Sequence, residues 1–161
     1  MKRRPPPERE PTATRPDPAC GVKVYVNAEA FSDAPLPLIE AAVRHVLKGA
    51  GAAAGEISVT LLDDAEIQAL NREYLGEDRP TDVIAFSLGE GETLGDVYLG
   101  FERACSQATE HDVTFEEELV RLAIHGTLHV LGQDHPDGPE RTRSPMFELQ
   151  ERLVREVLEA R

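Results

Sequence analysis

The sequence predicts an α+β domain in which a small sheet packs against about five helices. Short segments of alternating apolar and polar residues, typical of strands, occur in the first two thirds of the chain. Helical spacing of apolar residues dominates the last third. Strands that come early and helices that gather late favour an α+β class. The 161 residues are enough for one domain and few for two.

The first twenty residues are expected to form a disordered tail. Residues 1–20 contain six prolines and almost no apolar side chains. Proline removes backbone donors, and no buried face offsets the entropy of ordering this segment. A solvated tail is therefore preferred over an RNA-binding one, although its basic cluster could touch RNA. We predict a tail over residues 1–20 and a single domain over residues 21–161.

The first half of the domain contains two strand–helix units. Val22, Val24 and Val26 alternate with polar neighbours and predict a strand. A helix over 39–47 follows and ends at glycines, and alternation over 57–61 predicts the second strand. Asp63 and Glu66 have the spacing of a capping box, which begins a helix that continues through Tyr74 and ends at Gly76.

The second half begins with two more strands and continues as helices. Strands are expected over 83–86 and 97–99, with Gly89, Gly91 and Gly95 in the connection. A short helix over 103–109 follows. Thr114 and Glu117 cap a longer helix that runs to about Leu131. The last helix carries one apolar stripe: Met146, Leu149, Leu153 and Val157.

Three histidines near the end of the longer helix form the candidate site. His125 and His129 are four residues apart, so both project from one face of the helix. Gly132 can end the helix in a left-handed conformation and return His135 to the same point. Three imidazoles suit one Zn²⁺ per chain and leave a fourth position for water, through which the histidines would act catalytically. This predicts a zinc site in the C-terminal half.

The spacing resembles the metzincin pattern H-E-x-x-H-x-x-G-x-x-H, with Gly126 where that pattern has glutamate. The glutamate is the general base of peptide hydrolysis. The predicted metal site is retained without it, whereas a zinc peptidase becomes improbable.

The sequence resembles the YbeY family of bacterial rRNA maturation factors. Residues 125–135 read H-G-T-L-H-V-L-G-Q-D-H, close to the family's H-G-x-L-H-L-x-G-Y-D-H. Further similar segments extend over the domain from Gly21 onward: Leu70-Asn71 with Tyr74, the stretch from Asp78 to Ser87, Gly95-Asp96-Val97, and Met146 with Gln150-Glu151.

The resemblance implies a fold and an activity. The fold is an α+β domain with a mixed four-stranded sheet. The activity is that of a zinc-dependent, single-strand-specific endoribonuclease in ribosome biogenesis, which processes the 3′ end of small-subunit (16S) rRNA. Residues 21–161 would then form a metal-dependent endoribonuclease domain in the cytoplasm. Its partners would be single-stranded rRNA and the small ribosomal subunit.

Two positions depart from the family pattern. Leu75 stands where many members carry an arginine thought to serve the RNA site, and Gln133 replaces the tyrosine of the signature. Arg79 is the candidate replacement for the lost RNA contact, and a solvated loop charge is an equal alternative.

Other polar residues have two interpretations each. Glu118 shares a helical stripe with His125, so it either orients a ligand imidazole or stabilises the helix N-terminus. Asp134 either assists proton transfer or, as preferred, caps the loop. Thr81 and Asp82 either face the cleft or fix the turn before a strand. Four aromatic residues are assigned to the core rather than to base stacking: Tyr25, Phe86, Tyr98 and Phe101.

Composition limits the possible functions. The net charge of −13 argues against sequence-independent coating of nucleic acid, so RNA must meet a local basic patch. No apolar run is long enough to span a membrane. Cys20 and Cys105 are expected to be reduced thiols. The alternative to an endoribonuclease is a non-catalytic ribosome-assembly factor stabilised by zinc. The oligomeric state is left open.

Overall fold

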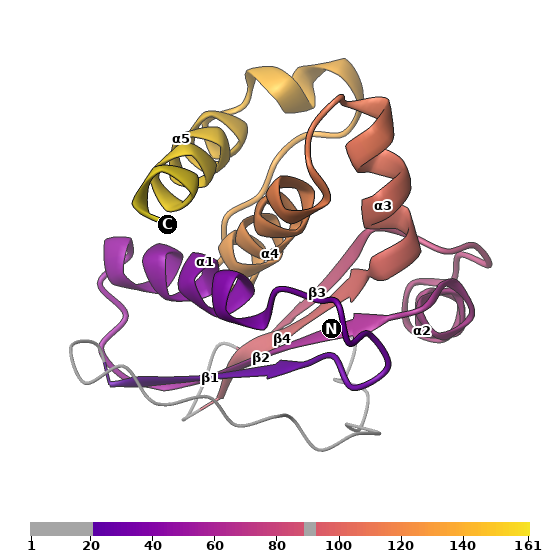
Figure 1. Cartoon of the computed structure of the whole chain (residues 1–161), viewed down its shortest axis with the longest axis horizontal. Helices are drawn as coiled ribbons and strands as arrows, with labels where there is room; N and C mark the ends of the chain where they lie inside the picture. The colour runs from indigo at the N-terminus through magenta and orange to yellow at the C-terminus, as the bar shows by residue number, and fades with distance from the viewer. Residues whose placement is uncertain (1–20, 89–92) are drawn as a thin grey trace.

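The computed structural model describes residues 21–88 and 93–161 (Figure 1). The expected tail, with Cys20, and the connection residues Gly89 and Gly91 lie outside this part of the chain. The elements in chain order are β1 (Val22–Asn27), α1 (Leu36–Gly49), β2 (Gly55–Leu62), α2 (Asp64–Leu75), β3 (Val83–Ser87), β4 (Thr93–Gly100), α3 (Phe101–Glu110), α4 (Phe115–Val130), the 3-10 helix η1 (Gly138–Arg143) and α5 (Pro145–Ala160). No helix in the described residues is long and apolar enough to cross a membrane.

The strands form one mixed four-stranded sheet in the order β1-β2-β4-β3. β1 and β2 are parallel, with Val24 opposite Ile57, and β2 is parallel to β4, with Val59 opposite Val97. β3 runs antiparallel to β4 and places Ala85 opposite Val97. The predicted fold class is confirmed, including the mixed sheet that the family resemblance implied.

Alternation along the strands gives the sheet two apolar faces. Val97 and Leu99 belong to the larger core cluster, which α1, α3 and α4 complete. Tyr98, between them, belongs with Phe86 to a smaller cluster closed by α2. The burial of Tyr98 and Phe86 confirms their assignment to the core. α2 therefore covers the face opposite to α4.

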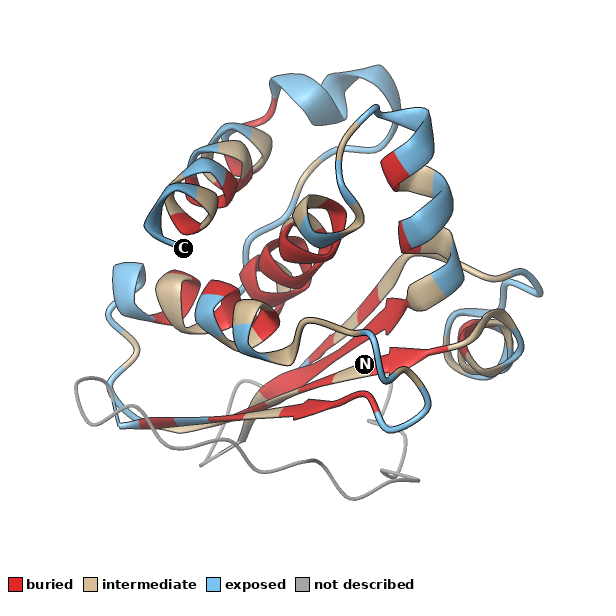
Figure 2. Ribbon diagram, in the orientation of Figure 1, coloured by how far each residue is buried: buried red, intermediate tan, exposed pale blue. Residues whose placement is uncertain are grey.

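α4 is the central element of the fold. Its middle is buried on nearly every side, and Figure 2 shows buried residues along most of its length. One side packs on the sheet, and another packs against α1 and α5 through a second apolar cluster that includes Ile124, Val46 and Val154. The helix that carries two of the three candidate ligands is thus held between the sheet and α5.

The predicted helix ends have the expected geometry. Asp63 and Glu66 form both hydrogen bonds of a capping box, and Gly76 ends α2 in the left-handed conformation. Thr114 caps α4 by accepting a hydrogen bond from the backbone N–H of Glu117 at 3.1 Å.

Three details differ from the sequence prediction. Gly95 lies inside β4 rather than in the connection, paired with Ile57 and Ser87. A Cβ there would clash with the carbonyl of Phe86 and with Val130, so this strand position requires glycine. α3 begins directly after β4, at Phe101, whose ring stacks on Phe31 with centroids 4.2 Å apart. η1 was not predicted, because its sequence has no apolar period.

Candidate metal centre

The three histidines lie together at the C-terminal end of α4. One ring nitrogen from each of His125, His129 and His135 can be chosen so that all three lie within 4.8 Å of one another. The Nε2 atoms of His125 and His129 are 3.1 Å apart. The centroid of the His135 ring lies 5.1 Å from that of His125 and 5.0 Å from that of His129. The structure therefore brings together all three histidines that the sequence singled out.

The chain reversal after α4 depends on Gly132. Gly132 has φ +93°, in the region that L side chains rarely adopt. The backbone N–H of Gln133 donates to the carbonyl of Leu128 at 3.0 Å, which closes the last helical turn. The Asp134 carboxylate then accepts from the backbone N–H of His135 at 2.8 Å. This contact supports the loop-capping role of Asp134.

Each candidate ligand has an oxygen acceptor at its Nδ1. His125 Nδ1 lies 2.6 Å from Oε1 of Gln150, His129 Nδ1 lies 3.0 Å from the carbonyl of Gln133, and His135 Nδ1 lies 3.0 Å from the carbonyl of Pro136. A neutral imidazole beside such an acceptor carries its proton on Nδ1, which leaves the lone pair on Nε2. The three Nε2 atoms are thus available to one ion.

Electrostatics also favour neutral ligands. Burial, together with nearby positive groups, lowers the pKa of His125 to about 4. Burial and the neighbouring His135 lower the pKa of His129 as well. Metal binding requires the neutral imidazole, so neither ligand needs to lose a proton at neutral pH. The donor atoms, their tautomers and their charge state fit a divalent cation that accepts nitrogen ligands.

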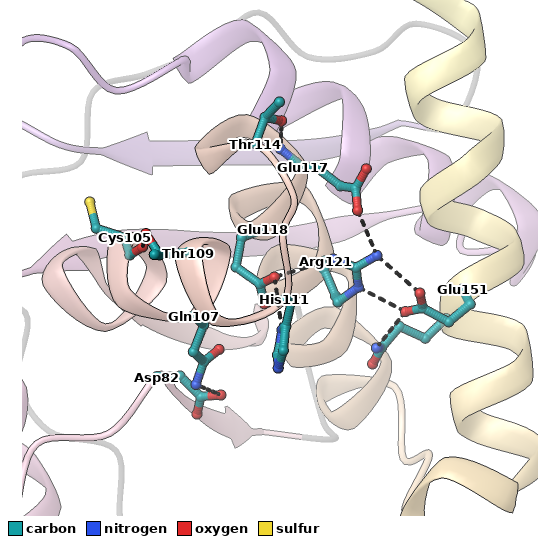
Figure 3. A network of polar contacts seen from close by, with 11 residues as sticks. Asp82, Cys105, Gln107, Thr109, His111, Thr114, Glu117, Glu118, Arg121 and Glu151 are labelled. Atoms are coloured by element: carbon teal, nitrogen blue, oxygen red, sulfur yellow. Dashed lines mark hydrogen bonds and ion pairs between the residues drawn. The ribbon is translucent and has the colours of Figure 1, made fainter.

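Gln150 connects the site to a part-buried ion-pair network between α4 and α5. Figure 3 shows Arg121 at the centre of this network, between Glu118 and Glu151. The side-chain amide of Gln150 donates to Glu151 at 3.1 Å. Glu151 in turn accepts two hydrogen bonds from Arg121, at 2.9 and 3.0 Å. Burial disfavours both charges, but these hydrogen bonds outweigh it, so the pKa of Glu151 is lowered and that of Arg121 is raised. The amide that orients His125 is therefore itself held in place.

Glu118 belongs to the same network but does not bond a ligand. Its side chain is 1% exposed, and it accepts from Arg121 at 3.2 Å and lies 3.6 Å from His111 Nδ1. The hydrogen bond to His125 comes from Gln150 on α5 instead. In the sequence, Gln150 stands out only as part of a segment similar to the family, and no local pattern relates it to a histidine on another helix.

Asp82 fixes the turn before β3 and also reaches the pocket. One carboxylate oxygen accepts from the backbone N–H of Val83 at 2.8 Å and from the Thr81 hydroxyl at 3.3 Å. The other accepts from Gln107 on α3 at 3.1 Å. Both interpretations of Asp82 thus apply.

Gly126 has a packing role. A Cβ at this position would lie 2.5 Å from Val97 Cγ1 and 3.1 Å from Val83 Cγ2. A glutamate here would enter the sheet interface rather than the metal centre. The position is therefore closed to the general base of a metzincin peptidase.

A pocket of about 570 Å³ opens beside His125. α3, α4, η1 and α5 line it, together with Asp82. Its lining includes Gln107, His111, Arg121, Arg141, Phe147 and Gln150. The candidate metal centre therefore adjoins a space that a substrate can enter.

The remaining predicted site residues lie outside this pocket. Arg79 is on the exposed loop after α2, where it pairs with Glu77 at 2.8 Å, and it does not line the pocket. Leu75 ends α2 and is 46% exposed. The backbone carbonyl of Gln133 accepts from His129 Nδ1. The replacement of the family's tyrosine by glutamine therefore does not remove this contact, because any residue type provides the carbonyl.

Comparisons with known proteins agree on one family. A family model described as endoribonuclease YbeY matches residues 26–158. Proteins named endoribonuclease YbeY from Desulfitobacterium hafniense and Persephonella marina are 46% and 38% identical over 100 and 125 residues. These matches cover 55% and 74% of this chain, and 64% and 81% of the relatives, so the chain spans just under two thirds of the first protein.

The fold agrees with a solved structure as well. The solution structure of TM1509 from Thermotoga maritima superposes with a TM-score of 0.61 at 33% identity, covering 86% of this chain and 90% of that one. The residues matched by the family model, 26–158, contain β2, β3, β4, α4 and all three histidines. The chain belongs to the YbeY family.

Proposed function

We propose that this protein is a zinc-dependent endoribonuclease that cleaves single-stranded RNA. The observation that carries the proposal is the convergence of three imidazoles, each with its Nδ1 beside an oxygen acceptor, next to an open pocket. The names of the family model and of the relatives supply the reaction class. Three nitrogen ligands that leave a coordination position open are typical of catalytic zinc.

The residues of the chain prepare the centre. His125, His129 and His135 would hold the ion through Nε2, and Gln150 orients the first of them. A zinc ion, when bound, supplies Lewis-acid polarisation of the phosphodiester and activation of water. The absence of a carboxylate at Gly126 separates this chemistry from peptide hydrolysis, because peptidases of this spacing need that base.

The proposed substrate is the 3′ end of small-subunit (16S) rRNA, approached on the small ribosomal subunit in the cytoplasm. The family resemblance supports this assignment. The net charge of −13 supports it indirectly, because RNA binding must then depend on a few local contacts and on the ribosome itself. Arg79 is one such candidate contact, since an exposed pair with Glu77 holds it only weakly.

A second candidate function is a non-catalytic ribosome-assembly factor whose zinc stabilises the C-terminal half. The acidic side chains in the pocket favour it, because Asp82, Glu110 and Glu151 would repel a phosphate. His125 also links α4 to α5 through Gln150, so a metal there would stabilise the packing of these helices.

The experiment combines metal analysis with RNA cleavage on one preparation. We expect one zinc per chain and cleavage of a single-stranded oligonucleotide but not of its duplex. His129→Ala should lose zinc and cleavage while its circular dichroism is retained. His45→Ala is the control, because His45 pairs with Glu156 on α5 and lies outside the cluster. A metal-free variant that still cleaves refutes the catalytic role of zinc, and an unfolded one supports the assembly factor.

A further inference from the structure

The pocket beside the candidate metal centre is acidic, and one of its two arginines, Arg121, is already paired with carboxylates. Its lining contains four carboxylates: Asp82, Glu110, Glu118 and Glu151. Arg121 donates to Glu117, Glu118 and Glu151, and His111 faces Glu118. The guanidinium of Arg121 is therefore already engaged by three carboxylates and has little charge to offer an anion.

Arg141 is the exception among the lining residues. It lies on η1 and is exposed. Its backbone carbonyl accepts from the N–H and the hydroxyl of Ser144. Within residues 21–88 and 93–161, its guanidinium has no ion-pair partner. Its donors are therefore unused by the part of the chain that the structure describes.

The backbone beneath Arg141 is firmly anchored. The buried Ser144 hydroxyl donates to the Arg141 carbonyl at 2.7 Å and accepts from the backbone N–H of Phe147 at 3.2 Å. These contacts join the end of η1 to the first turn of α5. These contacts fix the backbone of Arg141 at the edge of the pocket.

The location of Arg141 suits an anionic ligand. Arg141 lines the same pocket as His125, one of the three candidate metal ligands. A guanidinium recognises a phosphodiester well, because its planar donors match two phosphate oxygens.

We propose that Arg141 binds the phosphodiester of the RNA strand at the metal centre. This inference rests on the proposed function and assigns a phosphate contact that the sequence did not single out. Arg141 then supplies the RNA contact that is lost with Leu75. The carboxylates inside the pocket repel the phosphate, which therefore binds at the side of the pocket where Arg141 lies. Arg79 is less suited to this role, because it does not line the pocket.

Arg143 provides a matched control. It lies on the same short helix, is also exposed, and does not line the pocket. The experiment compares Arg141→Ala, Arg141→Lys and Arg143→Ala in the zinc-loaded full-length protein. It measures steady-state cleavage and equilibrium binding of a short single-stranded RNA at several salt concentrations, and zinc affinity by chelator competition.

Arg141→Ala should lower kcat/KM by at least about tenfold, as expected for a hydrogen-bonded contact to a charged group. The slope of log affinity against log salt should fall by about 0.7, the value for one phosphate contact on a single strand. Arg141→Lys should restore part of the activity, and Arg143→Ala should stay within about twofold of the wild type. Zinc affinity of Arg141→Ala should be unchanged.

If Arg141→Ala cleaves and binds the RNA as well as the wild type does, the proposal is overturned. Equal losses in both alanine variants would also overturn it, because they would indicate a general effect of charge. A loss of zinc in Arg141→Ala would assign the residue a structural role instead. If the wild type does not cleave RNA, the proposed function fails, and the binding and salt measurements alone decide the role of Arg141.

Discussion

Single residues around the histidines determine which ring nitrogen is available to a metal. The convergence of the three histidines was predictable from their spacing, but the orientation of their rings was not. Two of the three Nδ1 acceptors are backbone carbonyls, of Gln133 and Pro136, which any residue type provides. The third is Gln150, 25 positions away on another helix. Sequence patterns identify side chains, so they do not reveal contacts made by the main chain or across helices.

The role of Gln150 gives a prediction for metal affinity. Gln150→Leu keeps a side chain of similar size beside His125 but removes the oxygen that accepts from Nδ1–H. We expect zinc affinity to fall by about 10- to 100-fold, as for other residues that orient metal ligands. The control is Gln107→Leu, because Gln107 lines the same pocket but bonds Asp82. Chelator competition measures both variants, and equal affinities would show that Gln150 does not orient the ligand.

The lowered pKa of His125 gives a prediction for stability. Between pH 6.5 and about 4 the unfolded chain binds a proton at this residue and the folded chain does not. The metal-free protein should therefore lose stability as pH falls through this range, by about 1–3 kcal/mol from His125. His125→Asn should lack this part of the loss. Urea unfolding with a chelator present measures it, and parallel pH profiles of the two proteins would contradict the assignment.

At the scale of whole elements, the packing of α4 depends on Gly126, which in the sequence stands out only because the metzincin pattern has glutamate there. Gly126 allows α4 to approach β4 closely, and a Cβ there would overlap Val97. The helix and its cap were predictable from periodicity and from Thr114 with Glu117. The close approach was not, because it depends on which residues of the sheet lie opposite. Gly95 was misplaced in the connection for the same reason, since Val130 of α4 packs against it.

A pair of glycine substitutions tests this contact. Gly126→Ala should destabilise the protein by about 1–3 kcal/mol, because Val97 is fully buried and cannot move away. Gly49→Ala, at the end of α1, should have no such cost, since nothing lies within 4 Å of a Cβ there. Alanine in that helix instead favours folding by up to about 1 kcal/mol. Urea unfolding of both variants checks the prediction, which fails if Gly126→Ala is as stable as the wild type.

At the scale of the molecule, the candidate metal centre lies where the central helix α4 ends beside α5. The centre joins the end of α4 to the following loop and, through Gln150, to α5. The sequence predicted the order of these elements from their periods. It did not predict that α5 would pack beside the ligands, because packing partners are set by the tertiary fold.

This arrangement predicts what metal removal does. A ligand that binds only the folded state stabilises it by about 2.7 kcal/mol at a hundred times its Kd. A chelator should therefore lower the Tm of the zinc-loaded protein by roughly 5–10 °C for a domain of this size. The far-ultraviolet circular dichroism at 25 °C should not change, since the sheet and its helices keep their own apolar core. His129→Ala, measured alongside, should show no chelator effect on Tm. Loss of the circular dichroism signal on chelation would instead mean that zinc holds the fold together, as the assembly-factor alternative requires.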